Sequence, residues 1–283
     1  MGVTNYDIGT PAFRREAAQD YELSILTGMD SFAYIIRDRN TNRLLAYRAT
    51  ALPQRPPTEW PQQLSELIAG DERLDGVRYG KVLVGWETAA LTLIPEPLFD
   101  PGQLRSYLEQ LTVVGLEDEV RYDTYPELDA LLVYSGRGEV LEEAASQLRA
   151  GRLQHYAGGL LVAWAARARR LREDGISCCV RNGRLFIAGH DSRQRLLYFN
   201  TFSWENSQDA VYYLLLAYTQ CDYAPGQVPL YLSGTITSTD ELYYQFYRYV
   251  RDIRFSAYPA PPAVGPELEQ LPAHHYFDLL CLS

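Results

Sequence analysis

Short apolar runs alternate with polar turns along the first part of the chain. Apolar segments at 23–26, 32–36 and 44–47 are separated by turns of hairpin length, which predicts a meander of three antiparallel strands. A Pro-rich connection follows, and then the pattern predicts a helix over 58–69 and a strand over 81–84. Residues 1–21 are polar and mixed in charge, so we expect a loose leader there.

The same order of elements recurs later in the chain. Apolar segments at 176–180, 185–189 and 195–199 predict a second meander, followed by a helix over 207–219 and a strand over 228–232. Arg43-Leu-Leu and Arg195-Leu-Leu stand 152 residues apart. A shared order at a near-constant offset indicates an internal duplication. We therefore predict an α/β protein with two topologically similar halves, 22–151 and 152–283.

Four segments carry a resemblance to a known fold. They are Leu-Thr-Gly-Met-Asp-Ser at 26–31, Thr-Leu-Ile-Pro-Glu-Pro-Leu-Phe-Asp at 92–100, Tyr-Phe-Asn-Thr-Phe-Ser-Trp at 198–204 and Leu-Tyr-Leu-Ser-Gly at 230–234. With the two meanders, they resemble the actin-like (ribonuclease H-like) ATPase fold of actin, heat-shock chaperones and sugar kinases. The chain is most similar to a bacterial family, a domain of unknown function, with this fold. It also resembles the actin-like proteins of pilus assembly, which act as scaffolds.

The resemblance implies a nucleotide site between the halves. Its phosphate-side positions are Gly28, Asp30 and Ser31 in the first meander and Asn182 and Gly183 in the second. The adenine side corresponds to Ser233 and Gly234 at the end of a strand.

Active members of the fold place an Asp two residues before the glycine of the first turn, where it organises magnesium or water. Here that position is Leu26, and the second turn has no carboxylate. The resemblance thus implies at most weak binding of ATP and Mg²⁺, and we expect no catalytic residue.

Two functions remain open at this stage. The first is a non-catalytic protein, a pseudo-ATPase that acts as an interaction or assembly module. The alternative is an active ATPase or small-molecule kinase that uses displaced carboxylates such as Asp30 or Asp191. The segment 76–82 resembles a P-loop but is one residue short and lacks the Ser or Thr for magnesium.

Composition narrows the partners. Acidic residues outnumber basic ones by 36 to 26, and a net charge of −10 argues against non-specific binding of nucleic acid. Of 22 tyrosines, eleven follow residue 200. A helix expected over 239–253 places Tyr243, Tyr247 and Arg251 on one face, and Tyr and Arg are favoured in protein interfaces. We interpret this face as the contact surface for an unidentified protein partner, although tyrosines that merely cover apolar surface explain it as well.

The remaining signals indicate structure more than chemistry. No apolar stretch suits a signal peptide or a membrane span, so we expect a cytoplasmic protein without membrane insertion. The cysteines at 178, 179, 221 and 281 match no disulfide framework and predict reduced core thiols. Neither His190-Asp191 nor the set of His274, His275 and Cys281 has the spacing of a metal site.

Arginines gather at the end of the helix expected over 158–174, at positions 167, 169, 170 and 172. Arginines in a last turn complement the helix dipole and solvate the helix end, which is the simpler interpretation. A phosphate-binding patch is the alternative.

Overall fold

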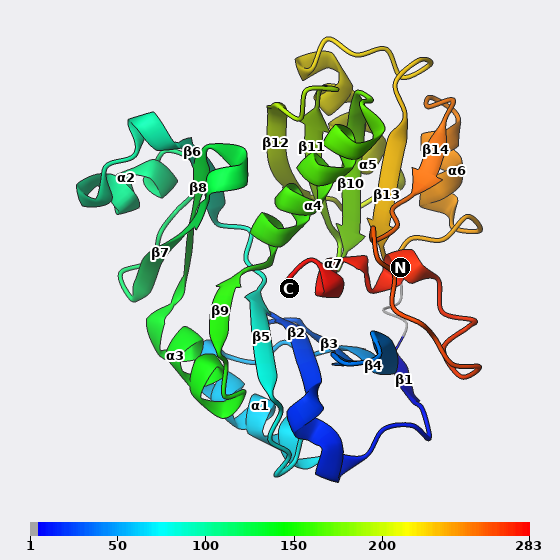
Figure 1. The fold of residues 1–283 in the computed structure, drawn as a ribbon. Coiled ribbons are helices and arrows are strands. Elements are labelled where there is room, and N and C mark those ends of the chain that lie inside the picture. The colour runs from blue at the N-terminus through cyan, green and yellow to red at the C-terminus, as the bar shows by residue number, and fades with distance from the viewer. Residues whose placement is uncertain (1–4) are drawn as a thin grey trace.

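The computed structural model describes residues 5–283, in which two large mixed sheets face one another across a layer of helix and C-terminal chain (Figure 1). The first sheet has the order β1-β4-β3-β2-β5-β9, and the second has the order β12-β11-β10-β13-β14. The strands of the first sheet are β1 (Tyr6–Gly9), β2 (Tyr21–Thr27), β3 (Ser31–Asp38), β4 (Arg43–Ala51), β5 (Lys81–Trp86) and β9 (Arg152–His155). Those of the second are β10 (Gly175–Arg181), β11 (Arg184–His190), β12 (Leu196–Ser203), β13 (Leu230–Gly234) and β14 (Ile253–Phe255).

Both predicted meanders are confirmed. In each sheet an antiparallel meander, β2-β3-β4 or β10-β11-β12, lies beside two strands that run parallel to its first strand. Strands β2 and β10 are buried along their whole length. Both strands are therefore covered on both faces, and their polar residues, such as Glu22 and Ser177, are buried with the apolar ones.

The segment expected to be a loose leader is ordered where the structure describes it. Strand β1 pairs antiparallel with β4, and a 3-10 helix, η1 (Arg15–Asp20), leads into β2. The prediction was wrong because β1 is a short edge strand with alternate residues exposed. Its pairing with β4 stabilises it, while its own composition does not predict a strand.

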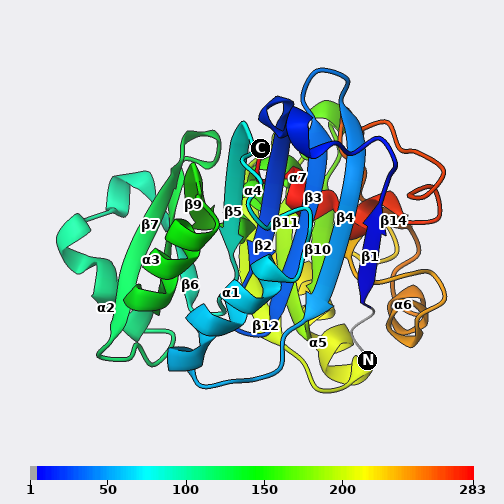
Figure 2. The same cartoon turned by 90° about the horizontal axis from the view of Figure 1, so that it is seen from below.

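Helices cover the outer faces of both sheets. Figure 2 shows α1 (Trp60–Ala69) and α3 (Gly138–Gln147) in front of the first sheet. On the second sheet, α5 (Ser207–Gln220) and α6 (Glu241–Tyr247) pack against the face turned away from the first sheet. A smaller sheet of order β6-β8-β7 projects to one side with α2 (Leu104–Glu109) (Figure 1). Its strands are β6 (Leu91–Pro95), β7 (Asp118–Tyr125) and β8 (Ala130–Arg137). The other 3-10 helices are η2 (Pro57–Glu59), η3 (Glu96–Leu98), η4 (Pro101–Gln103), η5 (Pro126–Leu128) and η6 (Ala273–His275).

A continuous apolar core joins the two large sheets. Helix α4 (Tyr156–Leu171) and the C-terminal helix α7 (Phe277–Leu280) lie between them, and one buried cluster takes residues from both sheets and both helices. At Gly159 the two helices meet so closely that a Cβ atom would overlap the carbonyl oxygen of Cys281. The space between the sheets is therefore filled with side chains along α4 and α7.

All four cysteines are buried and unpaired, as predicted for core thiols. Cys178 faces α5 in the outer core, whereas Cys179 belongs to the core between the sheets. Their opposite orientation follows from the two-residue period of a strand. Among residues 5–283, none of the helices combines the length and the apolar character that a membrane span requires.

Candidate functional site

The turns at the ends of β2 and β10 meet around a buried carboxylate, Glu87, which directly follows β5. Its side chain accepts hydrogen bonds from Ser31 Oγ (3.2 Å), Asn182 Nδ2 (3.2 Å) and Arg184 Nη1 (3.1 Å). Glu87 is 3% exposed. Donors from both meanders thus converge on one acidic group.

Arg184 links the two sides of this site. Its Nη1 binds Glu87, and its Nη2 lies 3.5 Å from the Asp30 carboxylate in the first turn. Burial raises the pKa of Glu87, and the positive charges of Arg184 and Arg181 oppose this shift without reversing it. Burial lowers the pKa of Arg184, but the charges of Glu87 and Asp30 outweigh this effect and raise it. We call Glu87, Arg184 and Asp30, with Ser31 and Asn182, the inter-turn cluster.

A close contact with Glu87 explains the glycine at position 28 without any ligand. A Cβ atom there would lie 3.0 Å from the carbonyl oxygen of Glu87, and the carbonyl of Gly28 accepts a hydrogen bond from Trp60 Nε1 (2.9 Å). Two residues earlier, Leu26 is buried in the core between the sheets and packs on Gly85. The position where active members of the fold carry Asp is therefore part of the apolar core.

Asn182 and Gly183 form the hairpin turn between β10 and β11. Both have positive φ angles, 49° and 69°, as in a type I′ turn, which suits Asn-Gly. The Asn182 side chain reaches Glu87, whereas nothing lies within 4 Å of a Cβ atom at Gly183. The turn geometry alone thus requires this pair, and only Asn182 contributes a side chain to the cluster.

Ser233 and Gly234 end β13, next to the end of β10. Gly234 has a φ of 86°, and a Cβ atom there would overlap the carbonyl oxygen of Val180. Ser233 is buried opposite Cys179, and its hydroxyl has no hydrogen-bond partner within residues 5–283. Their neighbours are thus the backbone and side chains of β10. The structure places these two residues at the same sheet edge as the second turn, because β10 and β13 run parallel.

Sequence reasoning missed Glu87 and Arg184. A usable signal was present, since Glu87 directly follows a buried strand that runs parallel to β2 and so ends at the same edge as Gly28. Arg184 directly follows the Asn-Gly turn. Their ion pair joins residues 97 positions apart, and no local pattern predicts such a pairing.

The alternative carboxylate, Asp191, has a local structural role. It accepts hydrogen bonds from the backbone amides of Arg193 (3.0 Å) and Arg195 (2.8 Å) and pairs with the Arg195 side chain. It therefore closes the β11–β12 turn, at the opposite end of β11 from Arg184. Within residues 5–283, no group of three or more His, Cys, Asp or Glu side chains is arranged to hold a metal ion.

The three residues of the predicted contact surface, Tyr243, Tyr247 and Arg251, do not lie on one face of a single helix. Helix α6 ends at Tyr247, so the helix expected over 239–253 is wrong beyond that residue, because the chain turns there to form β14 against β13. Tyr243 is half-buried and stacks on Phe255, while Tyr247 is 61% exposed. Arg251 lies beyond the helix, in the connection to β14. Beyond the helix, Tyr249 is exposed and Val250 is buried.

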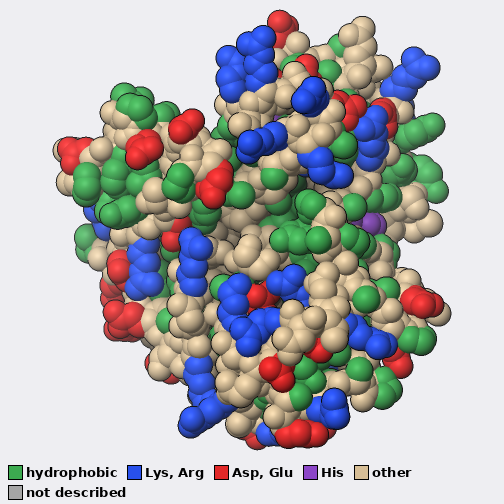
Figure 3. Space-filling model, in the orientation of Figure 1, with side chains coloured by type: hydrophobic (Ala, Val, Ile, Leu, Met, Phe, Trp, Pro, Cys, Tyr) green, Lys and Arg blue, Asp and Glu red, His purple; other side chains and the backbone are tan. Residues whose placement is uncertain are grey.

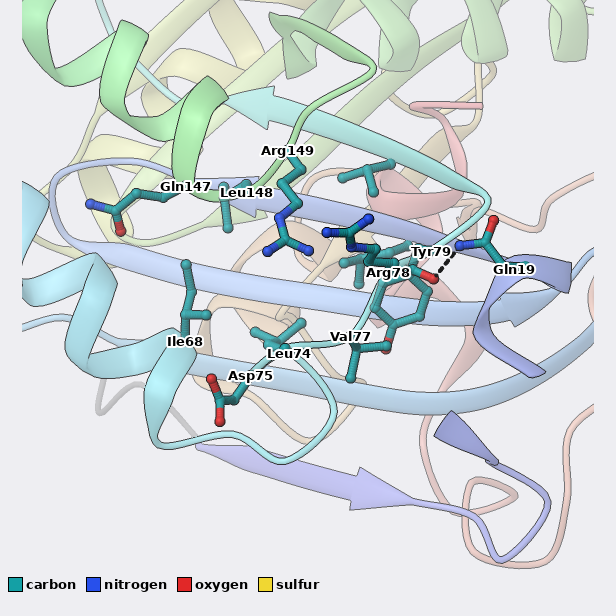
Figure 4. A pocket seen from close by; sticks show the side chains of 13 residues that line it. Gln19, Ile68, Leu74, Asp75, Val77, Arg78, Tyr79, Gln147, Leu148 and Arg149 are labelled. Atoms are coloured by element: carbon teal, nitrogen blue, oxygen red, sulfur yellow. Dashed lines mark hydrogen bonds between the residues drawn. The ribbon is translucent and has the colours of Figure 1, made fainter. Parts of the chain in front are cut away.

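Away from the inter-turn cluster, the first sheet borders cavities. One of about 530 Å³ opens at the edge of the first sheet, where α1, α3 and the loop after α1 meet (Figure 4). Leu74, Val77 and Leu148 form part of its apolar wall, and Arg78 and Arg149 extend over it (Figure 4). The P-loop-like segment 76–82 contributes to this wall, and none of the predicted site residues lines it.

A buried ion pair fixes the C-terminal helix near the site. Arg181 Nε binds the carboxylate of Asp278 at 2.6 Å, and both side chains are almost fully buried. Because Arg181 is on β10 and Asp278 on α7, this pair ties the end of the chain to the second sheet.

Comparisons with known proteins agree with this architecture. A solved structure from Bacteroides thetaiotaomicron, of a protein with an actin-like ATPase fold and unknown function, matches with a TM-score of 0.78 at 17% identity. The match covers 95% of this chain and 98% of that one. A structure of the PilM–PilN type IV pilus biogenesis complex matches with a TM-score of 0.58 at 13% identity, covering 92% and 97%.

No curated protein sequence matches the chain significantly. The structural matches show the fold, which is the actin-like ATPase fold that the sequence resemblance implied. A family model described as "Protein of unknown function (DUF3822)" matches residues 10–253. The chain therefore belongs to this family, whose model spans most of both large sheets.

Proposed function

We propose that this protein is a non-catalytic actin-like module that binds a protein partner. The observation that carries the proposal is the inter-turn cluster. The turns that hold phosphates in active members of the fold are here linked to each other by the ion pairs of Arg184 with Glu87 and Asp30.

Electrostatics at the cluster disfavour a nucleotide. A phosphate placed between the turns meets the carboxylates of Glu87 and Asp30, and Leu26 supplies no ligand for magnesium. It must also compete with Glu87 for Arg184. Phosphoryl transfer depends on positioning and charge stabilisation, so this arrangement supports weak ATP binding at most and no efficient hydrolysis.

We further propose that the two halves, 22–151 and 152–283, are related by duplication. Support comes from the strand orders of the two large sheets, which match once β1 is set aside, although β9 of the first sheet falls within 152–283. Strand β9 pairs with β5 in the first sheet, so the chain crosses between the sheets at the start of α4.

A protein partner is supported by the surface. The projecting part around α2 exposes Leu111 (66%), Val113 (94%) and Leu116 (99%), and Figure 3 shows hydrophobic side chains gathered there. Clustered apolar exposure of this kind is typical of interaction sites. The PilM relative is seen in a complex with PilN, which is a precedent for partner binding by this fold.

Titration with ATP and Mg²⁺ tests the main proposal. We expect no steady release of phosphate and little change in the thermal unfolding midpoint up to millimolar ATP.

Substitution of Tyr247 and Arg251 by Ala tests the contact surface predicted from sequence. It should leave the unfolding midpoint unchanged and reduce capture of the partner, whereas Tyr212→Ala, also exposed, serves as the control. Unchanged capture by the double variant would refute that surface.

Glu87 favours a second candidate function. A buried carboxylate with a raised pKa, at the end of a strand between the two turns, is suited to act as a general base. In that case the protein is an ATPase or small-molecule kinase, with Asp30 and Glu87 as its carboxylates. Steady turnover that Glu87→Gln abolishes would establish this function and overturn the first.

A further inference from the structure

The second half of α4 carries a buried arginine without a hydrogen-bond partner. Arg167 is 8% exposed, and none of its three side-chain nitrogens forms a hydrogen bond within residues 5–283. Its guanidinium lies over the Tyr231 ring, 3.7 Å from the centroid. Gly175 makes room for it, since a Cβ atom there would lie 3.0 Å from Nη2.

This burial is unfavourable for a cation. Burial lowers the pKa of Arg167 to about 10, which still leaves it charged at neutral pH. Stacking on Tyr231 offsets part of the desolvation but satisfies none of the five N–H donors. Buried charges in proteins are normally paired, so the unpaired donors point to an acceptor supplied from outside the chain.

A cavity of about 170 Å³ opens beside this guanidinium. Its wall includes Arg167, Arg170, Arg254 and Ser256 together with aromatic side chains such as Trp164. The Ser256 hydroxyl is also buried and has no partner among the described residues. Two independent polar groups without partners thus line one small cavity.

The charges around the cavity are unequal. Arg254 is neutralised by Glu173 (2.9 Å) and by Asp252, and Glu173 also accepts a hydrogen bond from the Tyr231 hydroxyl. Arg170 is exposed and forms no ion pair within the described chain. Glu173 and Asp252 thus offset two of the three positive charges of Arg167, Arg170 and Arg254, and one positive charge remains uncompensated beside the cavity in a protein of net charge −10. Figure 3 shows basic side chains gathered over this part of the second half.

We propose that this cavity binds a phosphate group. A phosphate monoanion balances the one surplus charge, and its oxygens accept hydrogen bonds from the planar Arg167 fork and from Ser256 when these side chains, whose polar atoms are buried in the cavity wall, turn toward it. The source is either free inorganic phosphate or the phosphoryl group of a small ester.

The cavity is separate from the inter-turn cluster. Gly175 is the first residue of β10, and Tyr231 is the second residue of β13, whereas the cluster lies at the opposite ends of these strands. Phosphate binding here is therefore independent of the fate of the nucleotide site.

Ordered water is the competing explanation. The cavity has room for several waters, which can satisfy buried donors without any ligand. Calorimetric titration of the full chain with sodium phosphate and, separately, with glycerol phosphate tests the choice. Sodium chloride and sodium acetate at matched ionic strength are the control ligands.

Wild type should bind phosphate saturably, with one site per chain. Arg167→Met should weaken binding about tenfold or more, because it removes charge-assisted hydrogen bonds. Arg170→Ala, at an exposed position, should weaken it as well without affecting folding. Arg169→Ala removes an exposed charge that does not line the cavity, so its affinity should match that of wild type.

The outcomes separate the explanations. Stronger binding of inorganic phosphate supports the free ion as ligand, and stronger binding of glycerol phosphate supports an ester. Absence of saturable binding at 20-fold molar excess over about 1 mM protein overturns the proposal. It is equally overturned if acetate binds as well as phosphate, or if the Arg167, Arg170 and Arg169 variants all retain wild-type affinity.

Discussion

Breaking the inter-turn cluster should lower stability in a way that depends on both partners and on pH. Arg184→Met removes the cation that faces Glu87, whose side chain is 1% exposed, while the Arg184 side chain is itself 23% exposed. Hydrogen bonds to charged groups contribute about 1.5–3 kcal/mol. Glu87 keeps its bonds from Ser31 and Asn182, so we expect a loss of about 2 kcal/mol in the free energy of unfolding at neutral pH.

A double-mutant cycle isolates the pairwise contribution. Glu87→Gln retains the shape and an acceptor for Arg184, so it should cost about 1 kcal/mol. The double variant should be less destabilised than the sum of the single variants, with a coupling energy of about 1–2 kcal/mol. Urea unfolding, followed by both tryptophan fluorescence and circular dichroism, measures these values. Arg248→Met, at an exposed arginine, is the matched control and should change stability by less than about 0.5 kcal/mol.

The pH dependence has a defined sign. A carboxyl group whose pKa is raised by folding stabilises the folded state in its protonated form. The Arg184→Met variant loses the charge that opposes this shift, so the pKa of Glu87 rises further above its ordinary value of 4.5. The deficit relative to wild type should therefore grow as the pH rises above 4.5 and nearly vanish below it. Additivity within about 0.5 kcal/mol, or an equal deficit at pH 4 and pH 8, would refute this account.

Three further predictions concern other parts of the fold. Gly159→Ala should destabilise the protein by about 2 kcal/mol or more in urea unfolding, since its Cβ overlaps a carbonyl oxygen at α7; Gly226→Ala, in open space, should be nearly neutral. Asp278→Asn should cost about 3 kcal/mol by the same measurement, because it leaves Arg181 charged and buried; a loss below 1 kcal/mol contradicts that reason. Burial lowers the pKa of His155 to about 4, so the neutral form is favoured in the folded state and stability is lost as the pH falls from 6.5 to 4. At 1.36 kcal/mol per unit this amounts to about 3 kcal/mol, and His155→Asn should flatten the profile of unfolding midpoint against pH; an unchanged slope would exclude His155 as the cause.

The predictable part of the fold is the part with a local signal. The apolar runs at 23–26 and 32–36 and their second-half counterparts form strands that are buried on both faces. This burial requires apolar neighbours but no particular residue types, so the apolar runs alone predict the strands. The Asn182-Gly183 turn was also predictable from a local signal, because its backbone geometry depends on those two residues. Strands β1 and β7, which expose alternate residues at sheet edges, lack that signal.

The site was only half predictable. Sequence resemblance pointed to Gly28, Asp30, Ser31 and Asn182, and the structure brings Asp30, Ser31 and Asn182 to one buried carboxylate, with Gly28 packed against it. The sequence resemblance did not point to Glu87, because this residue joins the cluster through an ion pair with Arg184, which lies 97 positions away in the sequence. The arginines at the end of α4 show the same limit: their spacing suggested a solvated helix end, and only packing against Tyr231 buries Arg167.

By itself, the sequence determined the two meanders with the helix and strand that follow each, the reduced core thiols and the loss of a carboxylate at Leu26. Each depends on a residue and its near neighbours, through periodicity, turn geometry or side-chain chemistry. The tertiary structure decided which charges meet, which arginine is buried and where α6 ends. Those outcomes depend on contacts between distant segments, whose energies no local pattern contains.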